Sequence, residues 1–236
     1  MDKNINKGIQ LLRLSSINGC KEAFFILGYL YHEGKNVRYD INKAIEFYKE
    51  ASSFNIHYSK NNLGVIYRYG IEIEKQNVAM AIIYFDEAIR QKNDFLSMYN
   101  KANILLYDET VKNVDDAINL LIESSNEFIH SLILLCIALI KKHGFNETIL
   151  EKDISTHKNI SSNLAQKILK TIKKLNIIQL FEYLYNLYNN ELFLYNESQS
   201  CIPFSQFQNK KLVKQNNVIA HNITSEFYEG FGNEFK

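Results

Sequence analysis

Residues 21–34, KEAFFILGYLYHEG, and residues 40–51, DINKAIEFYKEA, decide the fold because both stretches recur along the chain. The first returns 36 positions later, at 57–70, as HYSKNNLGVIYRYG. The second returns as NVAMAIIYFDEA at 77–88 and as NVDDAINLLIES at 113–124, and INKGIQLL at 5–12 matches its beginning. Self-similarity at a fixed period of this length is typical of proteins built from stacked supersecondary units.

The first stretch of each unit is predicted to be a helix. Ala23, Leu27 and Tyr31 recur every four residues, which places them on one helical face. Gly34 follows as the end of that helix, because glycine adopts the left-handed C′ conformation without a Cβ clash.

The second stretch is predicted to be the partner helix. Asp40 is a good N-cap, and Asn77 and Asn113 occupy the same position in later units. The inner face of this helix is expected to hold Ala44, Phe47, Tyr48 and Ala51. Gly28 and Gly64 each reduce helix propensity by about 1 kcal/mol relative to alanine. We expect them to be retained because they let the partner helix approach closely.

This pattern resembles the Sel1-like repeat, a relative of the tetratricopeptide repeat. The resemblance rests on Ala23-x3-Leu27-Gly28-x2-Tyr31-x2-Gly34, followed by Asp40-x2-Lys43-Ala44-x2-Phe47-Tyr48-x2-Ala51. It implies an all-α fold, a right-handed α-solenoid (α/α superhelix) of about four to five helix-turn-helix repeats that contacts other proteins.

The resemblance is clear over 21–90 and degenerate over 95–195. In the third unit Ala102 replaces the glycine and Leu105 the tyrosine. A fourth unit keeps the spacing of the first helix in Ser131, Leu135, Cys136 and Leu139. Its partner helix is expected later in the chain, with Ala165, Ile168 and Leu169. A fifth unit is suggested by Leu180, Leu184, Tyr185 and Tyr188. We expect a solenoid over 1–195 and a tail over 196–236 that is partly disordered or forms a short helix. The first unit is expected to begin with only its second helix.

Composition narrows the class of protein. Hydrophobic residues make up 46% of the chain, which argues against global disorder. The net charge of +1 argues against a dedicated nucleic-acid binder, which needs a basic excess. The longest apolar stretch, Ser131 to Ile140, is too short for a membrane span of about 20 residues. Cys20, Cys136 and Cys201 lack metal-ligand or disulfide spacing, so we expect a cytoplasmic protein without membrane contact.

No residues combine into a catalytic, cofactor or metal site. His32-Glu33 resembles the start of a zinc-protease motif, but Asn36 stands where the second histidine is needed, so both residues are expected to be exposed polar side chains. Asp115-Asp116 is interpreted as charge in the first turn of a helix. The stripe Lys167, Lys170, Lys173 and Lys174 is interpreted as a solvated face. Gly230-Phe231-Gly232 lacks a following helix start.

The candidate functional feature is a surface. Transferred by register from the related tetratricopeptide repeats, the concave groove is lined by residues of the first helix of each unit. The resemblance places there Phe25, Tyr29, His32, Tyr58, Asn61, Arg68, Tyr69, Tyr99, Asn103 and Tyr107. Tyrosine with arginine is common at interface hot spots. The alternative is that apolar members of these faces, such as Phe25, Val65 and Leu106, pack between units.

We therefore predict a non-catalytic scaffold that binds a peptide or helix of another protein, without cofactors. Self-association through the ends of the solenoid is a further expectation. Two alternatives stay open. The chain could be the repeat part of a larger adaptor or kinase-associated protein. It could also resemble the Sel1-like proteins linked with β-lactam binding and hydrolysis, although it lacks their paired cysteines, and we expect neither a leader nor a Ser-x-x-Lys nucleophile motif.

Overall fold

The computed structural model of the protein describes residues 3–34, 36–70, 76–125, 127–143, 147–156, 160–174, 193–195 and 201–203. These residues form ten helices and two strands. The elements are α1 (Lys3–Ile17), α2 (Lys21–Glu33), α3 (Ile41–Ser53), α4 (His57–Tyr69), α5 (Val78–Lys92), α6 (Phe95–Tyr107), α7 (Val114–Ser124), α8 (Ile129–His143), α9 (Glu147–Thr156), α10 (Ser162–Lys174), β1 (Phe193–Tyr195) and β2 (Cys201–Pro203).

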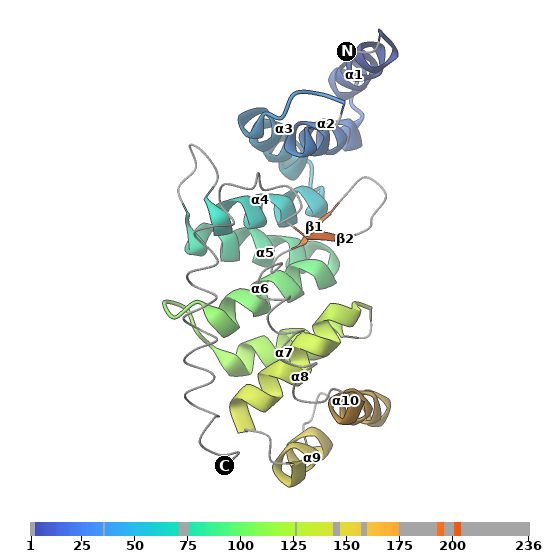
Figure 1. Ribbon diagram of the computed structural model, residues 1–236. Coiled ribbons are helices and arrows are strands. Elements are labelled where there is room, and N and C mark those ends of the chain that lie inside the picture. The colour runs from blue at the N-terminus through green and yellow to red at the C-terminus, as the bar shows by residue number, and fades with distance from the viewer. Residues whose placement is uncertain are drawn as a thin grey trace.

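Successive helices pair, and the pairs stack along one direction (Figure 1). The helix α2 packs on α3, α4 on α5 and α6 on α7, and each pair contacts the next. We call α2, α4 and α6 the A helices and α3, α5 and α7 the B helices. Helix α1 precedes α2 at the position of a B helix. One apolar core runs through the whole stack, which confirms the predicted helical repeat fold.

The predicted N-caps begin all three B helices. The side chains of Asp40, Asn77 and Asn113 accept hydrogen bonds from the backbone N–H three residues ahead, at 3.1, 3.0 and 3.1 Å. Each of these bonds satisfies one of the N–H groups that have no partner within the helix.

The same three residues also join each B helix to its A helix. Their backbone N–H groups donate to the carbonyl oxygens of Tyr31, Tyr67 and Leu105, at 3.0, 2.8 and 2.9 Å. The third unit keeps this bond although leucine replaces tyrosine there, because the contact uses only the backbone. The hairpin geometry is therefore preserved where the sequence pattern weakens.

The repeated glycines lie where a B helix crosses an A helix closely. A Cβ atom on Gly28 would lie 2.7 Å from the Tyr48 ring, and one on Gly64 would lie 2.6 Å from the Phe85 ring. Both rings are fully buried. This confirms that these glycines allow close helix approach. Gly34 ends α2 with a φ of 67° and donates its N–H to Leu30 O at 3.0 Å, as predicted.

The C-terminal helices are less regular. Helix α8 contains the predicted fourth A-type helix, and its Ser131, Leu135, Cys136 and Leu139 are buried. Helix α10, which carries the buried Ile168, packs on α8. Helix α9 intervenes in the chain, which explains the predicted delay of the partner helix.

A small antiparallel hairpin is the one departure from helical structure among the described residues. β1 pairs with β2 in the register Phe193↔Pro203, Leu194↔Ile202 and Tyr195↔Cys201. Neither strand was predicted, and the expected boundary at 195/196 falls between them. The expected helix around Leu180 to Tyr188 and the tail residues 204–236 lie outside the described residues.

Candidate functional site

The ten predicted groove residues all lie on the three A helices, but their exposure differs. Tyr58, Arg68, Tyr69 and Tyr107 are partly exposed. The other six are buried, with exposed fractions of 7% or less: Phe25, Tyr29, His32, Asn61, Tyr99 and Asn103. The A helices therefore carry an accessible set of groove residues and a buried set.

Aromatic contacts account for much of the buried set. The Phe25 ring lies 6.0 Å from that of Tyr48 and 5.7 Å from that of Tyr58. The Tyr99 ring meets that of Phe128 edge to face at 5.2 Å. Phe25, Val65 and Leu106 are all buried and belong to the apolar core.

Helix α4 is buried along nine successive residues, Ser59 to Tyr67. Helices α3, α5 and α6 surround it, and β1 adds a further neighbour. Leu194 of β1 is fully buried and belongs to the apolar core. An extended segment from far along the chain thus covers part of an A helix (Figure 1).

A chain of buried polar side chains links α2, α3 and α4. Asn62 Nδ2 donates to Tyr48 Oη at 3.1 Å. The Tyr48 hydroxyl lies 3.4 Å from His32 Nδ1. Because Tyr48 accepts from Asn62, its own proton is available for that histidine nitrogen. Hydrogen bonding of this kind compensates for the removal of these groups from water.

The same polar chain continues from α4 to α6. Asn61 Nδ2 donates to Asn62 Oδ1 at 3.3 Å, and Asn61 Oδ1 accepts from Asn100 Nδ2 at 2.8 Å. The Ser97 hydroxyl lies 3.1 Å from Asn61 Oδ1 and also contacts the carboxylate of Asp94, the N-cap of α6. These groups join adjacent units inside the solenoid.

Sequence reasoning missed Asn62, Ser97 and Asn100. A signal was present, because Asn61 and Ser97 lie 36 residues apart, at the repeat length. Two polar residues at one repeat position suggest a polar contact between units. Asn61 was assigned to the groove, but its side chain also holds α4 to α6.

Burial favours the neutral forms of the titratable side chains in this hydrogen-bonded network. Desolvation lowers the pKa of His32 to about 3 and raises the pKa of Tyr48. A neutral imidazole beside a neutral phenol provides hydrogen bonds without charge. The expectation that His32 is an exposed polar residue is wrong, because Tyr48 and its neighbours enclose the ring.

The accessible set includes one ion pair between repeats. Arg68 Nη1 lies 3.2 Å from Asp108 Oδ2. Asp108 follows α6, so the pair connects the C-terminal ends of two A helices. The arginine head group is thereby held in place at the edge of the A-helix surface.

The other candidate residues have structural roles where they are described. Burial raises the pKa of Cys136 to about 12, which fits a packing residue, whereas Cys20 is exposed. Asp115 pairs with Lys142 at 2.9 Å, in the first turn of α7. Of the lysine stripe, the side chain of Lys170 is described and is exposed, in agreement with a solvated face; Gly230 and Gly232 lie outside the described part of the chain.

No metal or membrane site is found in the described part of the chain. There, no three His, Cys, Asp or Glu side chains gather as a metal site requires. Among the described helices, none combines the length and apolar character needed to cross a bilayer. Ser155 and Lys158 have the Ser-x-x-Lys spacing of β-lactam-reactive enzymes, but the Ser155 hydroxyl is exposed and donates to Lys152 O at 2.9 Å. Lys158 itself is not among the described residues.

Comparison with known proteins agrees with this geometry. The family model of the Sel1 repeat matches residues 22–53 and 57–93. The fold is similar to a protective antigen of uropathogenic Escherichia coli strains that displays an SLR fold, with a TM-score of 0.56 and 19% identity over 81% of this chain and 38% of the antigen chain. A Sel1 repeat protein from Oxalobacter formigenes aligns with a TM-score of 0.48 and 16% identity over 78% of this chain and 88% of that one.

No curated protein sequence matches the chain. It spans well under half of the Escherichia coli antigen, so that likeness concerns the fold alone. The repeat matches coincide with the helix pairs α2–α3 and α4–α5. The chain therefore carries two adjacent Sel1 repeats, residues 22–53 and 57–93, within a helical repeat fold of the SLR type.

Proposed function

We propose that this chain is a non-catalytic scaffold whose A helices hold a segment of another protein. Sel1 repeat proteins generally mediate contacts between proteins, which supports the class of function. The proposed contact surface is the partly exposed portion of the predicted groove, formed by Tyr58, Arg68, Tyr69 and Tyr107, whereas the other six groove residues are buried. Tyrosine and arginine are the side chains that contribute most to protein interfaces.

The observation that carries the proposal is the packing of β1 on α4. Leu194 is fully buried although it comes from the far end of the chain. A surface that accommodates one extended segment of this chain has the shape to accommodate a similar segment of a partner. Such a segment would be extended and would carry an aliphatic side chain between aromatic ones, as Phe193-Leu194-Tyr195 does.

A synthetic peptide that copies residues 192–204 tests this proposal. In the wild-type chain the linked segment competes at an effective concentration of about 1 mM, so we expect weak binding of the added peptide. The Leu194→Asp variant should bind the peptide more tightly, as measured by fluorescence anisotropy. Ile83→Asp is the matched control because Ile83 is exposed on α5, outside the proposed contact surface.

Equal binding to all three proteins, or none to any, would contradict the proposal. A peptide carrying the same Leu→Asp change should not bind. Partner capture with the Tyr58→Ala, Tyr69→Ala and Tyr107→Ala triple variant then tests the accessible tyrosines, with circular dichroism as the check on folding. Unchanged recovery of a partner that binds the wild type would remove these residues from the surface.

The proposal includes a cytoplasmic location and self-association through the N-terminal end. Cys20 and Cys136, the cysteines whose side chains are described, are free thiols, which supports a reducing compartment. On α1, Leu11, Leu14 and Ile17 are exposed by 55%, 54% and 79%. Analytical ultracentrifugation of the wild type and Leu14→Asp would test self-association, which predicts a larger monomer fraction for the variant.

A further inference from the structure

An open cavity of about 700 Å³ lies between α1, α2 and the start of α3. One wall is a single face of α1, since Asn6, Ile9, Gln10 and Arg13 follow the spacing i, i+3, i+4 and i+7. The opposite wall is formed by Tyr31, Val37, Arg38, Tyr39, Asp40 and Lys43. None of these belongs to the proposed A-helix surface.

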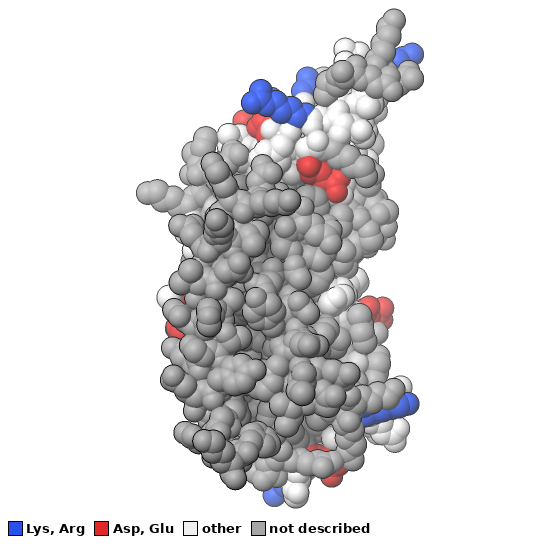
Figure 2. Space-filling model, in the orientation of Figure 1, with Lys and Arg blue, Asp and Glu red and all other residues white. Residues whose placement is uncertain are grey.

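The lining of this cavity is basic. It contains three cations, Arg13, Arg38 and Lys43, and one carboxylate, Asp40. At the N-terminal end of the face drawn in Figure 2, basic side chains stand together with acidic ones. The excess is local, because the whole chain has a net charge of only +1.

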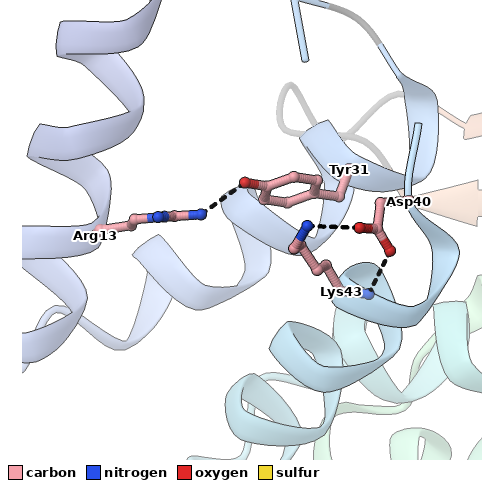
Figure 3. A network of polar contacts seen from close by, with 4 residues as sticks. All are labelled: Arg13, Tyr31, Asp40 and Lys43. Atoms are coloured by element: carbon pink, nitrogen blue, oxygen red, sulfur yellow. Dashed lines mark hydrogen bonds and ion pairs between the residues drawn. The ribbon is translucent and has the colours of Figure 1, made fainter. Parts of the chain in front are cut away.

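The single carboxylate is already engaged. Asp40 accepts from the backbone N–H of Lys43 at 3.1 Å and pairs with Lys43 Nζ at 2.7 Å (Figure 3). The Lys43 side-chain hydrogen bond, followed by its backbone N–H, holds the pKa of Asp40 below its usual value. Lys43 and Asp40 therefore neutralise each other, and the positive charge that remains belongs to the two arginines.

The arginines have no carboxylate partner among the described residues. Arg13 Nη2 donates to the Tyr31 hydroxyl at 2.8 Å, which orients the guanidinium toward the cavity wall and leaves most of its N–H groups available (Figure 3). Tyr31 is itself fixed by Phe47, whose ring stacks on it at 5.7 Å. Arg38 is exposed on the opposite wall.

We propose that this cavity binds an acidic peptide segment of a partner protein, with Arg13 and Arg38 pairing its carboxylates. A guanidinium presents a planar fork of donors that matches the two oxygens of a carboxylate. Tyr39, exposed by 37%, and Ile9 provide apolar contacts for the peptide stem. A nucleic acid is disfavoured because the chain as a whole carries a net charge of only +1, without the basic excess that phosphate binding requires.

The test uses a fluorescein-labelled peptide of six glutamates and the whole chain of 236 residues at low salt. Replacing both arginines, as Arg13→Gln with Arg38→Gln, should weaken binding by about tenfold or more, because two charge-assisted contacts are lost. The matched control, Arg90→Gln with Lys92→Gln, changes the net charge equally on exposed positions of α5 and should leave binding within about twofold. Arg38→Gln alone is a second variant that spares the Tyr31 contact.

The proposal is overturned if the control pair loses as much affinity as the cavity pair, since binding would then follow net charge alone. It is also overturned if a six-glutamine peptide binds equally well, or if no glutamate peptide binds. Inorganic phosphate or a short oligonucleotide that binds through the same arginines more tightly than the peptide would replace the acidic peptide as ligand. These outcomes are independent of Leu194 and the A-helix surface, so they do not bear on the proposed scaffold function.

Discussion

At the scale of single residues, the glycines and the aromatic rings opposite them form matched pairs. Gly28 faces Tyr48 and Gly64 faces Phe85, in both cases at distances too short for a Cβ atom. In the third unit Ala102 replaces the glycine, and Leu121 occupies the register position of Phe85. Both are fully buried. The A helix of this unit therefore has alanine in place of the smaller glycine, and its B helix has leucine in place of the larger aromatic residue. The two changes together keep the filled volume similar.

Gly64→Ala is therefore expected to destabilise the protein. Overpacking against Phe85 costs about 1–3 kcal/mol, and the gain in helix propensity of about 1 kcal/mol offsets only part of it. Chemical denaturation should show a net loss of stability that Phe85→Leu partly restores in the double variant. Gly8→Ala is the control, because Gly8 has open space around it and should gain up to about 1 kcal/mol. Equal stabilisation by both alanines would contradict the matched pairing.

His32 is expected to make stability depend on pH. Its pKa is lowered from 6.5 to about 3 by burial, so between these values the unfolded chain binds a proton that the folded chain does not. Stability contributed by neutral His32 is therefore present above pH 6.5 and lost as pH falls toward 3, by up to about 1.4 kcal/mol per pH unit. In His32→Asn, whose amide oxygen can accept from Tyr48, urea denaturation should show a shallower decline over this range. An unchanged slope would contradict the assignment.

At the scale of elements, two kinds of hydrogen bond join the helices in addition to the apolar core and the ion pairs. Backbone bonds from the B-helix N-caps to the A helices are repeated in all three hairpins and use no particular side chain. The buried polar network from His32 to Asp94 is not repeated from unit to unit in the described part of the stack and depends on particular residues. The first kind builds the hairpin, and the second fixes the position of neighbouring hairpins relative to one another.

Asn61→Ala should weaken the junction between α4 and α6. The substitution removes the acceptor of Asn100 Nδ2 and the Ser97 contact in a dry interior, a change of about 1–3 kcal/mol. Asn42→Ala on the exposed face of α3 is the control and should change stability by less than about 0.5 kcal/mol. Similar effects of the two substitutions in thermal denaturation would show that the polar chain adds little to stability.

At the scale of the whole molecule, burial is uneven along the stack. Helix α1 contacts α2 and exposes three large apolar side chains, whereas nine of the thirteen residues of α4 and ten of the thirteen of α6 are buried. In repeat proteins each unit is stabilised by its neighbours, so a terminal element with one neighbour opens most easily.

The rates of amide hydrogen exchange should follow the burial of the helices. Mass spectrometry of the native protein is expected to find the fastest amide exchange in α1 and the slowest in α4 and α6. Leu14→Asp, at an exposed position, should leave the pattern in α4 unchanged. Uniform exchange from α1 to α7 would instead indicate that the stack opens as one cooperative unit.

The repeat length, the N-caps and the glycine positions could be predicted from sequence because they are local or periodic. Asp40 can cap a helix whatever lies beside it. The spacing between Gly28 and Gly64 equals the length of one helical hairpin. The groove assignment was transferred by register alone. Register identifies the helix face on which Asn61 or Tyr99 lies, but it does not show what packs against that face.

The sequence by itself determined that the chain folds as stacked helical hairpins, because helix periodicity, capping and repetition act over a few residues at a time. Only the tertiary structure decided that His32 and Asn61 are buried, that Leu194 packs beside α4 and that Arg13 and Arg38 face one cavity. These relations join residues that are distant along the chain and follow no period. They depend on how the folded helices pack against one another, and this packing cannot be predicted from local sequence patterns.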